Sequence, residues 1–329
     1  MPFILYTKYF ILRGMSKKIL LSGVKPTGRP HIGNYFGAMK QFADLQNDYE
    51  CYFMIADYHA LNHIQNANDM KENIFGVALD YLAIGLDPEK VTIFKQSDVS
   101  AHTELAWMFD SITTMPYLMR AHAFKDAEAK NKEISVGTFN YPMLMAADIL
   151  LYDTDVVPVG QDQKQHIEIT RDTAEKFNHT FSADVFKLPN PLIVEGVATV
   201  PGIDGQKMSK SYNNTIPLFA TDEEIEKQVM SIVTDSSGER PENVYAIHKL
   251  FRSEQELATL YEEKKGKYKD LKEALIEDIK AFIAPLRARR EALAADPSAV
   301  ERILVDGAAR ANIRAAAKLA DAKRAIGVL

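Results

Sequence analysis

Short apolar runs alternate with longer amphipathic stretches through the first half of the chain. The apolar runs are typical of buried strands, and the stretches between them repeat apolar residues at helical spacing. This alternation predicts a parallel sheet with right-handed crossovers, the α/β class with a Rossmann-like arrangement. The predicted strands are 18–24, 51–56, 91–94 and 155–159, and the predicted helices are 35–45, 70–86, 103–111, 143–152 and 165–177.

The pattern changes after Thr215, where only helical spacing remains. The predicted helices are 223–233, 244–251, 254–261, 271–293 and 299–326, and Pro285 should kink or break the fourth of them. We therefore expect a Rossmann-like catalytic domain at 15–216, with a loop at 205–214, and a smaller all-helical domain at 217–296. We expect the last segment, 297–329, to pack back on the sheet domain.

The first fourteen residues are apolar and weakly basic, and Met15 follows them directly. We interpret 1–14 as an N-terminal extension before the natural start. No run reaches the roughly eighteen apolar residues that a membrane span requires. The sequence therefore predicts a cytoplasmic protein with no membrane partner.

Composition limits the chemistry that the chain can carry. The 329 residues are 47% hydrophobic, carry a formal net charge of −6 and include one cysteine, Cys51. A single cysteine excludes an internal disulfide framework and any multi-cysteine metal site. The negative net charge argues against nucleic acid binding over the whole surface. Two local basic runs, 264–269 and 287–290, remain candidates for RNA contact or ordinary solvated helix faces.

The run Lys207-Met208-Ser209-Lys210-Ser211 is the strongest candidate for chemistry. It lies in a loop between a Pro-Gly turn at 201–202 and Asn213-Asn214. Lysine charges stabilise the negative charge that grows during phosphoryl or adenylyl transfer, and hydroxyls add hydrogen bonds. The run alone also fits an exposed polar loop, so a second signal is needed.

That second signal is His31-Ile32-Gly33-Asn34, placed where the first strand should turn into a helix. Free backbone amides and the helix dipole favour phosphate at such a junction. Gly33 has no side chain, so a flat base could approach the backbone there. The two segments together resemble the HIGH and KMSKS signatures of class I aminoacyl-tRNA synthetases, with Asn34 in place of the final histidine.

The segments 141–152 and 155–168 narrow the resemblance. Asp148 is an acid within an otherwise apolar helix, and a buried carboxylate needs a partner. An internal salt bridge would satisfy it, as would a ligand. With its surroundings, this stretch resembles the tryptophanyl-tRNA synthetase family, over most of 18–177, the KMSKS loop and more loosely the carboxyl-terminal helices.

The resemblance implies which residues act. It assigns catalysis to His31, Asn34, Lys207 and Lys210. It assigns ATP binding to Lys25, Thr27, Gly33, Asn34, Gly160, Asp162, Lys207, Met208, Ser209 and Ser211. It assigns tryptophan binding to Asp148, Tyr141, Met145, Val157, Val159, Gln163, His59 and Leu21, with Asp148 accepting a hydrogen bond from the indole N–H. His59 could equally be a histidine of the core.

The resemblance also implies the partners. These are L-tryptophan, ATP with Mg²⁺, tRNA(Trp) read by the helical domain, and a second copy in a homodimer. We see no carboxylate set for a tightly bound metal. Lys25, Leu21 and Gln161 depart from the commoner family residues glutamine, phenylalanine and glutamate.

Three alternatives remain. A tyrosyl-tRNA synthetase shares the architecture and both signatures, although the run ending at Asp148 fits it less well. A non-catalytic paralogue would bind RNA or nucleotide, but simple binding does not require both Lys207 and Lys210. A dinucleotide-binding dehydrogenase would carry G-x-G-x-x-G after the first strand, and this chain does not.

Overall fold

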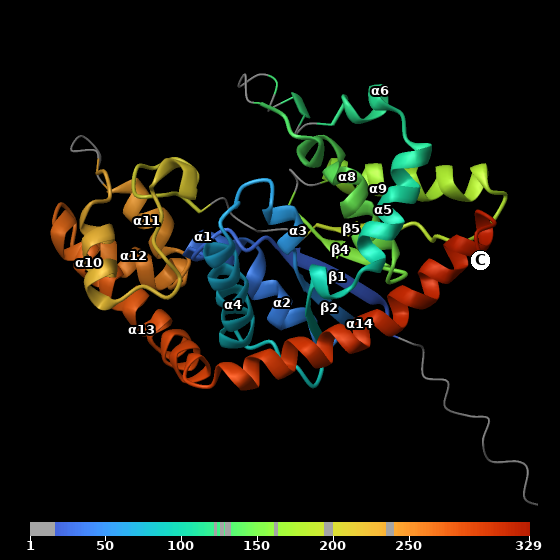
Figure 1. Ribbon diagram of the computed structural model, residues 1–329. Coiled ribbons are helices and arrows are strands. Elements are labelled where there is room, and N and C mark those ends of the chain that lie inside the picture. The colour runs from blue at the N-terminus through green and yellow to red at the C-terminus, as the bar shows by residue number, and fades with distance from the viewer. Residues whose placement is uncertain are drawn as a thin grey trace, which may run out of the picture.

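A five-stranded parallel sheet forms the centre of the molecule (Figure 1). The computed structural model describes residues 17–121, 124–125, 128, 133–160, 164–193, 200–234 and 240–329. The strands lie in the order β3-β2-β1-β4-β5. They are β1 Ile19–Val24, β2 Glu50–Ile55, β3 Thr92–Lys95, β4 Val156–Pro158 and β5 Asn190–Leu192. The predicted α/β, Rossmann-like class is confirmed. The short β5 was not predicted.

Helices surround the sheet. In the amino-terminal part they are α1 Ile32–Asn34, the π-helical η1 Tyr35–Met39, α2 Lys40–Leu45, α3 Asp57–Ala60, α4 Ala67–Ala83, the 3₁₀ turn η2 Gln96–Asp98, α5 Ala101–Ile112, α6 Met115–Leu118, α8 Val136–Leu150 and α9 Lys164–Thr180. After them come the 3₁₀ turn η4 Lys210–Tyr212, α10 Asp222–Met230, α11 Glu242–His248, α12 Glu254–Glu263, α13 Tyr268–Ala294 and α14 Pro297–Ala325.

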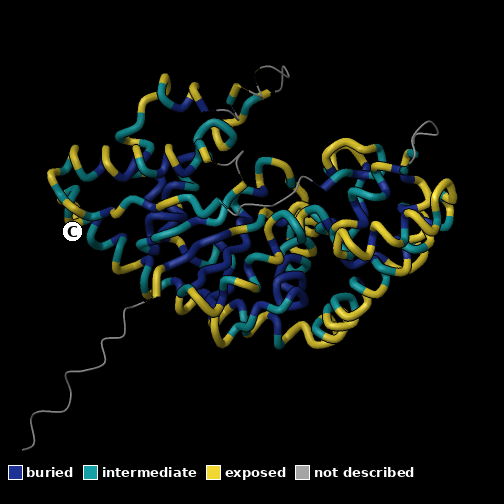
Figure 2. The backbone as a smooth tube through the Cα atoms, turned by 180° about the vertical axis from the view of Figure 1, so that it is seen from behind, coloured by how far each residue is buried: buried dark blue, intermediate teal, exposed yellow. Residues whose placement is uncertain are grey.

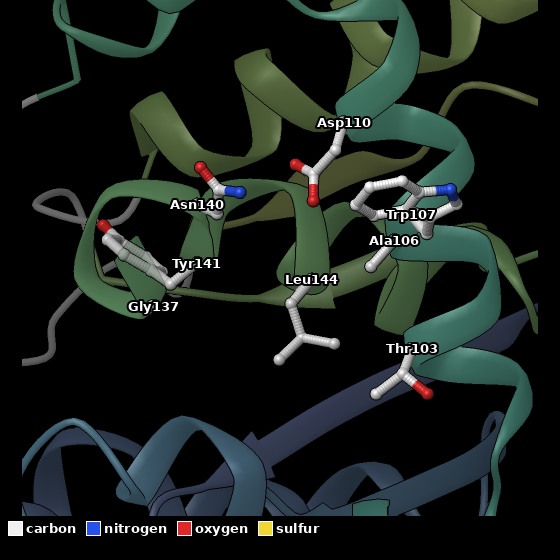
Figure 3. A pocket seen from close by; sticks show the side chains of 8 residues that line it. All are labelled: Thr103, Ala106, Trp107, Asp110, Gly137, Asn140, Tyr141 and Leu144. Carbon is white, nitrogen blue, oxygen red and sulfur yellow. The ribbon is translucent and has the colours of Figure 1, made fainter. Parts of the chain in front are cut away.

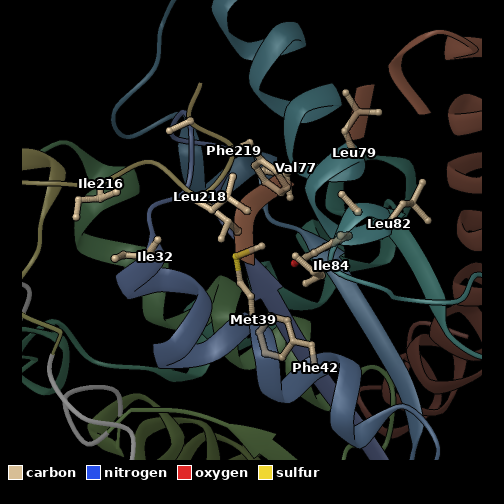
Figure 4. Close-up of a cluster of buried hydrophobic side chains, with 14 of the residues drawn as sticks. Ile32, Met39, Phe42, Val77, Leu79, Leu82, Ile84, Ile216, Leu218 and Phe219 are labelled. Atoms are coloured by element: carbon tan, nitrogen blue, oxygen red, sulfur yellow. The ribbon is translucent and has the colours of Figure 1, made fainter. Parts of the chain in front are cut away.

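Alternate residues of each strand enter two separate cores, one on each face of the sheet. Leu20 and Phe53 belong to the core shared with α1, α2, α4 and the helical part (Figure 4). Leu21 and Tyr52 belong to the core shared with α5, α8, α9 and most of α14. Figure 2 shows buried residues concentrated at the centre of the sheet, whereas the edge strand β5 is intermediate to exposed. Burial on both faces explains why the strands read as continuous apolar runs.

The two longest helices link the helical part to the sheet (Figure 1). α13 continues through Pro285 and ends at Ala294, so of the expected kink or break at this proline, the break is wrong. α14 then packs closely on β3 at Gly307. A side-chain carbon at Gly307 would lie 1.8 Å from the Ile93 carbonyl oxygen, so only glycine permits this approach.

The strand order places a switch point between β1 and β4. The chain leaves β1 towards β2 on one side, and the sheet continues through β4 on the other. Ligands of open α/β sheets bind at the carboxyl ends of the strands beside such a point. Within the described part of the chain, no helix is both long and apolar enough to cross a membrane. The expected extension at 1–14 lies outside the described residues.

Candidate active site

The His31–Asn34 signature forms a reciprocal cap at the start of its helix. The Nδ1 atom of His31 accepts a hydrogen bond from the backbone N–H of Asn34 at 3.2 Å. In return, Oδ1 of Asn34 accepts one from the backbone N–H of His31 at 3.0 Å. This capping box shows what Asn34 does at the fourth position of the HIGH-like signature, where it stands in place of histidine. The Asn34 residue is exposed, which leaves its amide nitrogen available to a ligand.

His31 is neutral at physiological pH. Burial, together with the positive charge of Lys210, lowers the pKa of His31 to about 4. Because Nδ1 accepts the Asn34 N–H, the proton of the neutral ring belongs on Nε2. His31 can therefore donate a hydrogen bond from Nε2 to a phosphate oxygen without carrying a charge.

The KMSKS loop, residues 205–214, is held by a buried asparagine. Asn214 is 1% exposed, accepts the Ser209 N–H at 2.8 Å and donates to Oδ1 of Asp204 at 2.7 Å. Met208 is also buried and anchors the loop in the core, so any contact of Met208 with ATP would come from its backbone. Gly202 lies so close to Asn214 that a side-chain carbon there would be 2.3 Å from Nδ2.

The segment after the loop brings the two signatures together. The N–H of Ile32 donates to the Ile216 carbonyl at 3.0 Å, and the N–H of Leu218 donates to the Pro30 carbonyl at 2.9 Å. Ile32, Ile216 and Leu218 are buried side by side in one core (Figure 4). The apolar side chains therefore fix the register in which polar groups above them meet.

Lys210 meets the loop that follows β1. Its Nζ atom donates to the carbonyl oxygens of Thr27 at 3.1 Å and Gly28 at 2.8 Å. Burial lowers the pKa of Lys210, and the charge of Asp80 opposes this shift. Lys207 and Ser211 are exposed, and the Ser211 hydroxyl lies 2.8 Å from that of Ser209. Cations and hydroxyls thus gather beside the first signature, as polyphosphate binding requires.

A second group of predicted residues gathers at the switch point. Tyr141, Met145 and Asp148 are spaced four and three apart on α8, which places them on one face of that helix. Leu21 and Val157 come from the adjacent strands β1 and β4 and lie buried in the same core. Met145 and Val159 pack against this core as well. The resulting surroundings are apolar, with Asp148 as an acid among them.

Asp148 is 2% exposed and has partners on both carboxylate oxygens. His59 Nε2 lies 2.8 Å from Oδ2, and Gln96 donates to Oδ1 at 2.8 Å. His102 Nδ1 lies 2.6 Å from Oδ1 without the geometry of a hydrogen bond. Burial opposes ionisation, but the charges of His102 and His59 and the contact with His59 outweigh it and lower the pKa of Asp148. The carboxylate is therefore ionised and oriented.

Several of these residues were not predicted. Gln96 directly follows β3, so the rule that singled out His31 and His59 at strand ends would also have found it. His102 is fully buried within α5, where the sequence gives no sign of a role. His166, whose Nε2 lies 2.9 Å from the Tyr141 hydroxyl, was missed too. Asn214 and Asp204 are recognisable only from the folded loop.

The remaining residues predicted to bind ATP or tryptophan are either exposed or outside the described residues. Lys25 and Thr27 are exposed on the loop after β1, and Gly160 is exposed just beyond β4. Asp162 and Gln163, with Gln161, lie outside the described residues. Among the residues that the structure describes, no group of three or more His, Cys, Asp or Glu side chains could hold a metal ion.

The basic run 287–290 is occupied by contacts within the chain. Arg287 binds Asp222 at 2.8 Å, Arg289 donates to the Ala83 carbonyl, and Arg290 binds Asp80. These arginines join α13 to α10 and α4. In the run 264–269, Lys265, Lys267 and Lys269 are exposed.

Comparison with known proteins identifies the family. Residues 15–295 match the model for tRNA synthetases class I (W and Y). The tryptophan–tRNA ligase of Fusobacterium nucleatum is 48% identical over 317 residues, covering 94% of this chain and 98% of its own. The chain therefore belongs to the class I tRNA synthetases, within the tryptophanyl-tRNA synthetase family. The resemblance seen in the sequence is confirmed.

Solved structures agree. The tryptophanyl-tRNA synthetase of Campylobacter jejuni, complexed with ADP and tryptophan, superposes with a TM-score of 0.88 at 41% identity, covering 94% of this chain and 99% of that one. The tyrosyl-tRNA synthetase of Archaeoglobus fulgidus reaches a TM-score of 0.64 at 21% identity, with 84% of this chain and 91% of that one covered. The latter likeness shows a shared fold only.

Proposed function

We propose that this protein activates L-tryptophan with ATP and transfers the tryptophanyl group to tRNA(Trp), as a tryptophan–tRNA ligase. The observation that carries the proposal is the ionised, buried Asp148 among apolar side chains at the switch point. An indole combines a large apolar surface with one N–H donor, which is the complement of this site. Family membership supports the same conclusion.

The first step forms a mixed anhydride. An oxygen of the tryptophan carboxylate bonds to the α-phosphorus of ATP, and the bond from that phosphorus to the bridging oxygen breaks, releasing pyrophosphate. The nucleophile is already charged, so catalysis requires alignment and stabilisation of the phosphate charge rather than a general base. Magnesium enters with the nucleotide as part of the substrate.

The residues around the two signatures supply that stabilisation. His31 donates from Nε2, Asn34 donates from its exposed amide, and Lys207 and Lys210 contribute positive charge. Thr27, Gly33, Gly160, Ser209 and Ser211 would complete the nucleotide contacts, with Lys25, Met208 and Asp162. In the second step a terminal ribose hydroxyl of tRNA attacks the carbonyl carbon of the adenylate, and AMP leaves.

The tryptophan site distinguishes its substrate by a polar partner. Asp148 would accept the indole N–H, and His59, Leu21, Met145, Val157 and Val159 would surround the ring. Tyr141 and Gln163 would bind the α-ammonium group. A phenylalanine would leave the Asp148 carboxylate without this donor, and a tyrosine hydroxyl would meet an apolar wall.

The protein also acts as a homodimer in this proposal. Exposed apolar side chains collect on α5, α6 and the start of α8, where Trp107 is 73% exposed, Met115 66% and Val136 75%. Trp107 borders a pocket with Tyr141 and Leu144 (Figure 3). An apolar patch beside a substrate site is what a second copy would cover. The domain limits at 216 and 296, anticodon reading by the helical domain and the cytoplasmic location stay predictions.

Amino-acid-dependent exchange of pyrophosphate into ATP, measured with each standard amino acid and without tRNA, tests the proposal. We expect exchange with tryptophan alone. Exchange with tyrosine would contradict the role given to Asp148, and no exchange would favour a non-catalytic paralogue. Charging of a tRNA(Trp) transcript then tests the second step.

A further inference from the structure

A buried ion pair joins the sheet part of the chain to the helical part. Asp80 of α4 is 3% exposed, and its Oδ1 atom accepts a hydrogen bond from Nε of Arg290 of α13 at 2.6 Å. A side-chain carbon built on Gly76, one turn earlier on α4, would lie 3.7 Å from a guanidinium nitrogen of Arg290. The guanidinium therefore lies along α4 between Gly76 and Asp80.

Stability alone is a weak reason for such a pair. Taking two charges out of water costs about as much as their attraction returns, and apolar residues of similar size often serve a fold equally well. The position of Asp80 relative to the nucleotide loops suggests a second role.

Asp80 acts on three cations, two of which belong to the nucleotide loops. Burial raises the pKa of Asp80 to about 6, and the charges of Arg290, Lys210 and Arg29 oppose that rise. The carboxylate is consequently ionised at pH 8. Burial lowers the pKa of Lys210, and the charge of Asp80 in turn opposes that lowering. One buried anion thus lies within electrostatic range of the lysine that should bind phosphate.

Contacts continue from Arg290 to the loop that holds Lys210. The guanidinium of Arg290 lies 5.2 Å from the ring centre of Phe219. The backbone carbonyl of Phe219 accepts a hydrogen bond from Nη2 of Arg29 at 3.3 Å. Arg29 also forms a two-pronged pair with Glu224 of α10, at 2.9 and 3.0 Å. Its neighbour Gly28 supplies the carbonyl that accepts Lys210. A succession of contacts therefore links the ion pair to the loop that holds Lys210.

We propose that Asp80 and Arg290 are positioning residues for Lys210. The negative charge of Asp80 favours the position in which Lys210 binds the Thr27 and Gly28 carbonyls. Arg290 neutralises part of that charge, so α13 of the helical part sets how firmly Lys210 is held. ATP must draw Lys210 away from this position to obtain its charge. The inference rests on the ATP site proposed above and adds to it two residues that do not touch the substrate.

The two halves of the pair should act in opposite directions. Asp80→Asn removes the anion that competes with phosphate for Lys210, so the KM for ATP should fall by about threefold to tenfold. Arg290→Met keeps the anion and removes its neutralising partner, so the KM for ATP should rise by a similar factor. The KM for tryptophan should stay unchanged in both variants, because α8, which carries Asp148, packs into the core on the other face of the sheet.

A purely structural role predicts a different result. Either substitution breaks the same buried pair, so both would lower the melting temperature and would move the KM for ATP in the same direction or not at all. Asp278→Asn is the matched control. It breaks an acid–arginine pair with Arg252, at 2.8 Å, within the helical part. We expect this control to melt earlier while the KM for ATP stays unchanged.

The experiment is tryptophan-dependent pyrophosphate exchange at pH 8, with ATP and tryptophan varied separately and melting curves for every variant. Shifts of opposite sign in the KM for ATP support the inference. Shifts of the same sign, or none, overturn it. If Asp80→Asn does not fold, Arg290→Met decides alone: a raised KM for ATP supports the inference, and an unchanged or lowered one overturns it. Absence of exchange in the natural protein would overturn the proposed function instead.

Discussion

The side-chain nitrogen of Lys210 lies 2.8 Å from the carbonyl oxygen of Gly28, a residue 182 positions earlier in the chain. The contact closes the KMSKS loop onto the loop that follows β1. It depends on the backbone pairing of 216–218 with 30–32 beneath it. The apolar residues of that pairing set the distance between two groups that the reaction needs together.

Lys210→Ala should therefore impair adenylate formation far more than amino acid binding. Loss of one preorganised charge at a developing anion typically costs about 10²–10³ in rate. We expect a loss of this size in the rate of pyrophosphate exchange, with tryptophan affinity by calorimetry changed by less than about twofold. Ser182→Ala, far from the site in sequence and on a surface turn, is the control. Equal exchange rates in Lys210→Ala and the natural protein would contradict the role of Lys210.

Asp148→Asn should weaken discrimination between tryptophan and phenylalanine. The asparagine amide would face the Gln96 amide, which donates to the natural carboxylate, and the ring nitrogens of His59 and His102. We expect the ratio of kcat/KM values for the two amino acids to fall at least about tenfold. Unfolding in urea should show a loss of about 1–3 kcal/mol, because buried polar groups lose their partners. Unchanged selectivity would contradict the assignment of Asp148 to the indole site.

Gly202→Ala should loosen the KMSKS loop. The added carbon would lie 2.3 Å from Nδ2 of Asn214 and 2.6 Å from its carbonyl oxygen, so the backbone must shift. We expect a loss of about 2 kcal/mol in unfolding free energy and a raised KM for ATP. Gly76→Ala is the matched control for the unfolding free energy, because its new carbon meets only ordinary contact at 3.7 Å inside a helix. That variant should gain about 0.5–1 kcal/mol.

Neutral His31 should make stability depend on pH. Its pKa falls from 6.5 in the unfolded chain to about 4 in the folded protein, chiefly through burial and then through Lys210. Between these values the unfolded state binds more protons, so unfolding free energy should decrease as the pH falls from 6.5 to 4. The pKa of Asp80, raised by burial to about 6, acts in the opposite sense over most of this range.

His31→Asn isolates the histidine contribution, since asparagine keeps a side-chain acceptor at the helix cap. Urea unfolding between pH 7 and pH 4.5 should show a shallower decrease for the variant than for the natural protein. The difference should not exceed about 3 kcal/mol. Parallel curves for the two proteins would show that folding does not lower the pKa of His31.

Trp107 is the single tryptophan of the chain, so its fluorescence reports on the surface of α5. If a second copy covers this surface, emission should shift to longer wavelength on dilution as the dimer dissociates. Trp107→Lys should sediment as a monomer, whereas Val328→Lys, an exposed apolar position near the carboxyl terminus, should remain dimeric. A natural protein that sediments as a monomer would contradict the dimer.

The sequence by itself determined the class of fold and the chemistry of the two signatures. Strands buried on both faces appear in the sequence as apolar runs, and helices appear as apolar residues repeated at helical spacing. Both signals are local. Asp148 could be singled out because it is an acid in an otherwise apolar helix, whereas His31 and Lys210 were singled out by the two signatures and their resemblance to a known family. Local pattern was sufficient for these.

Only the tertiary structure decided how those residues are held. His102 and Gln96 reach Asp148 from α5 and η2, and Asn214 reaches back to Asp204, through packing that no local pattern encodes. The same holds for Arg290, which the sequence suggested as a candidate for RNA contact and which in the folded chain forms an ion pair with Asp80. A charged side chain pairs with whatever the packed core brings within about 3 Å, and long-range packing alone fixes that partner.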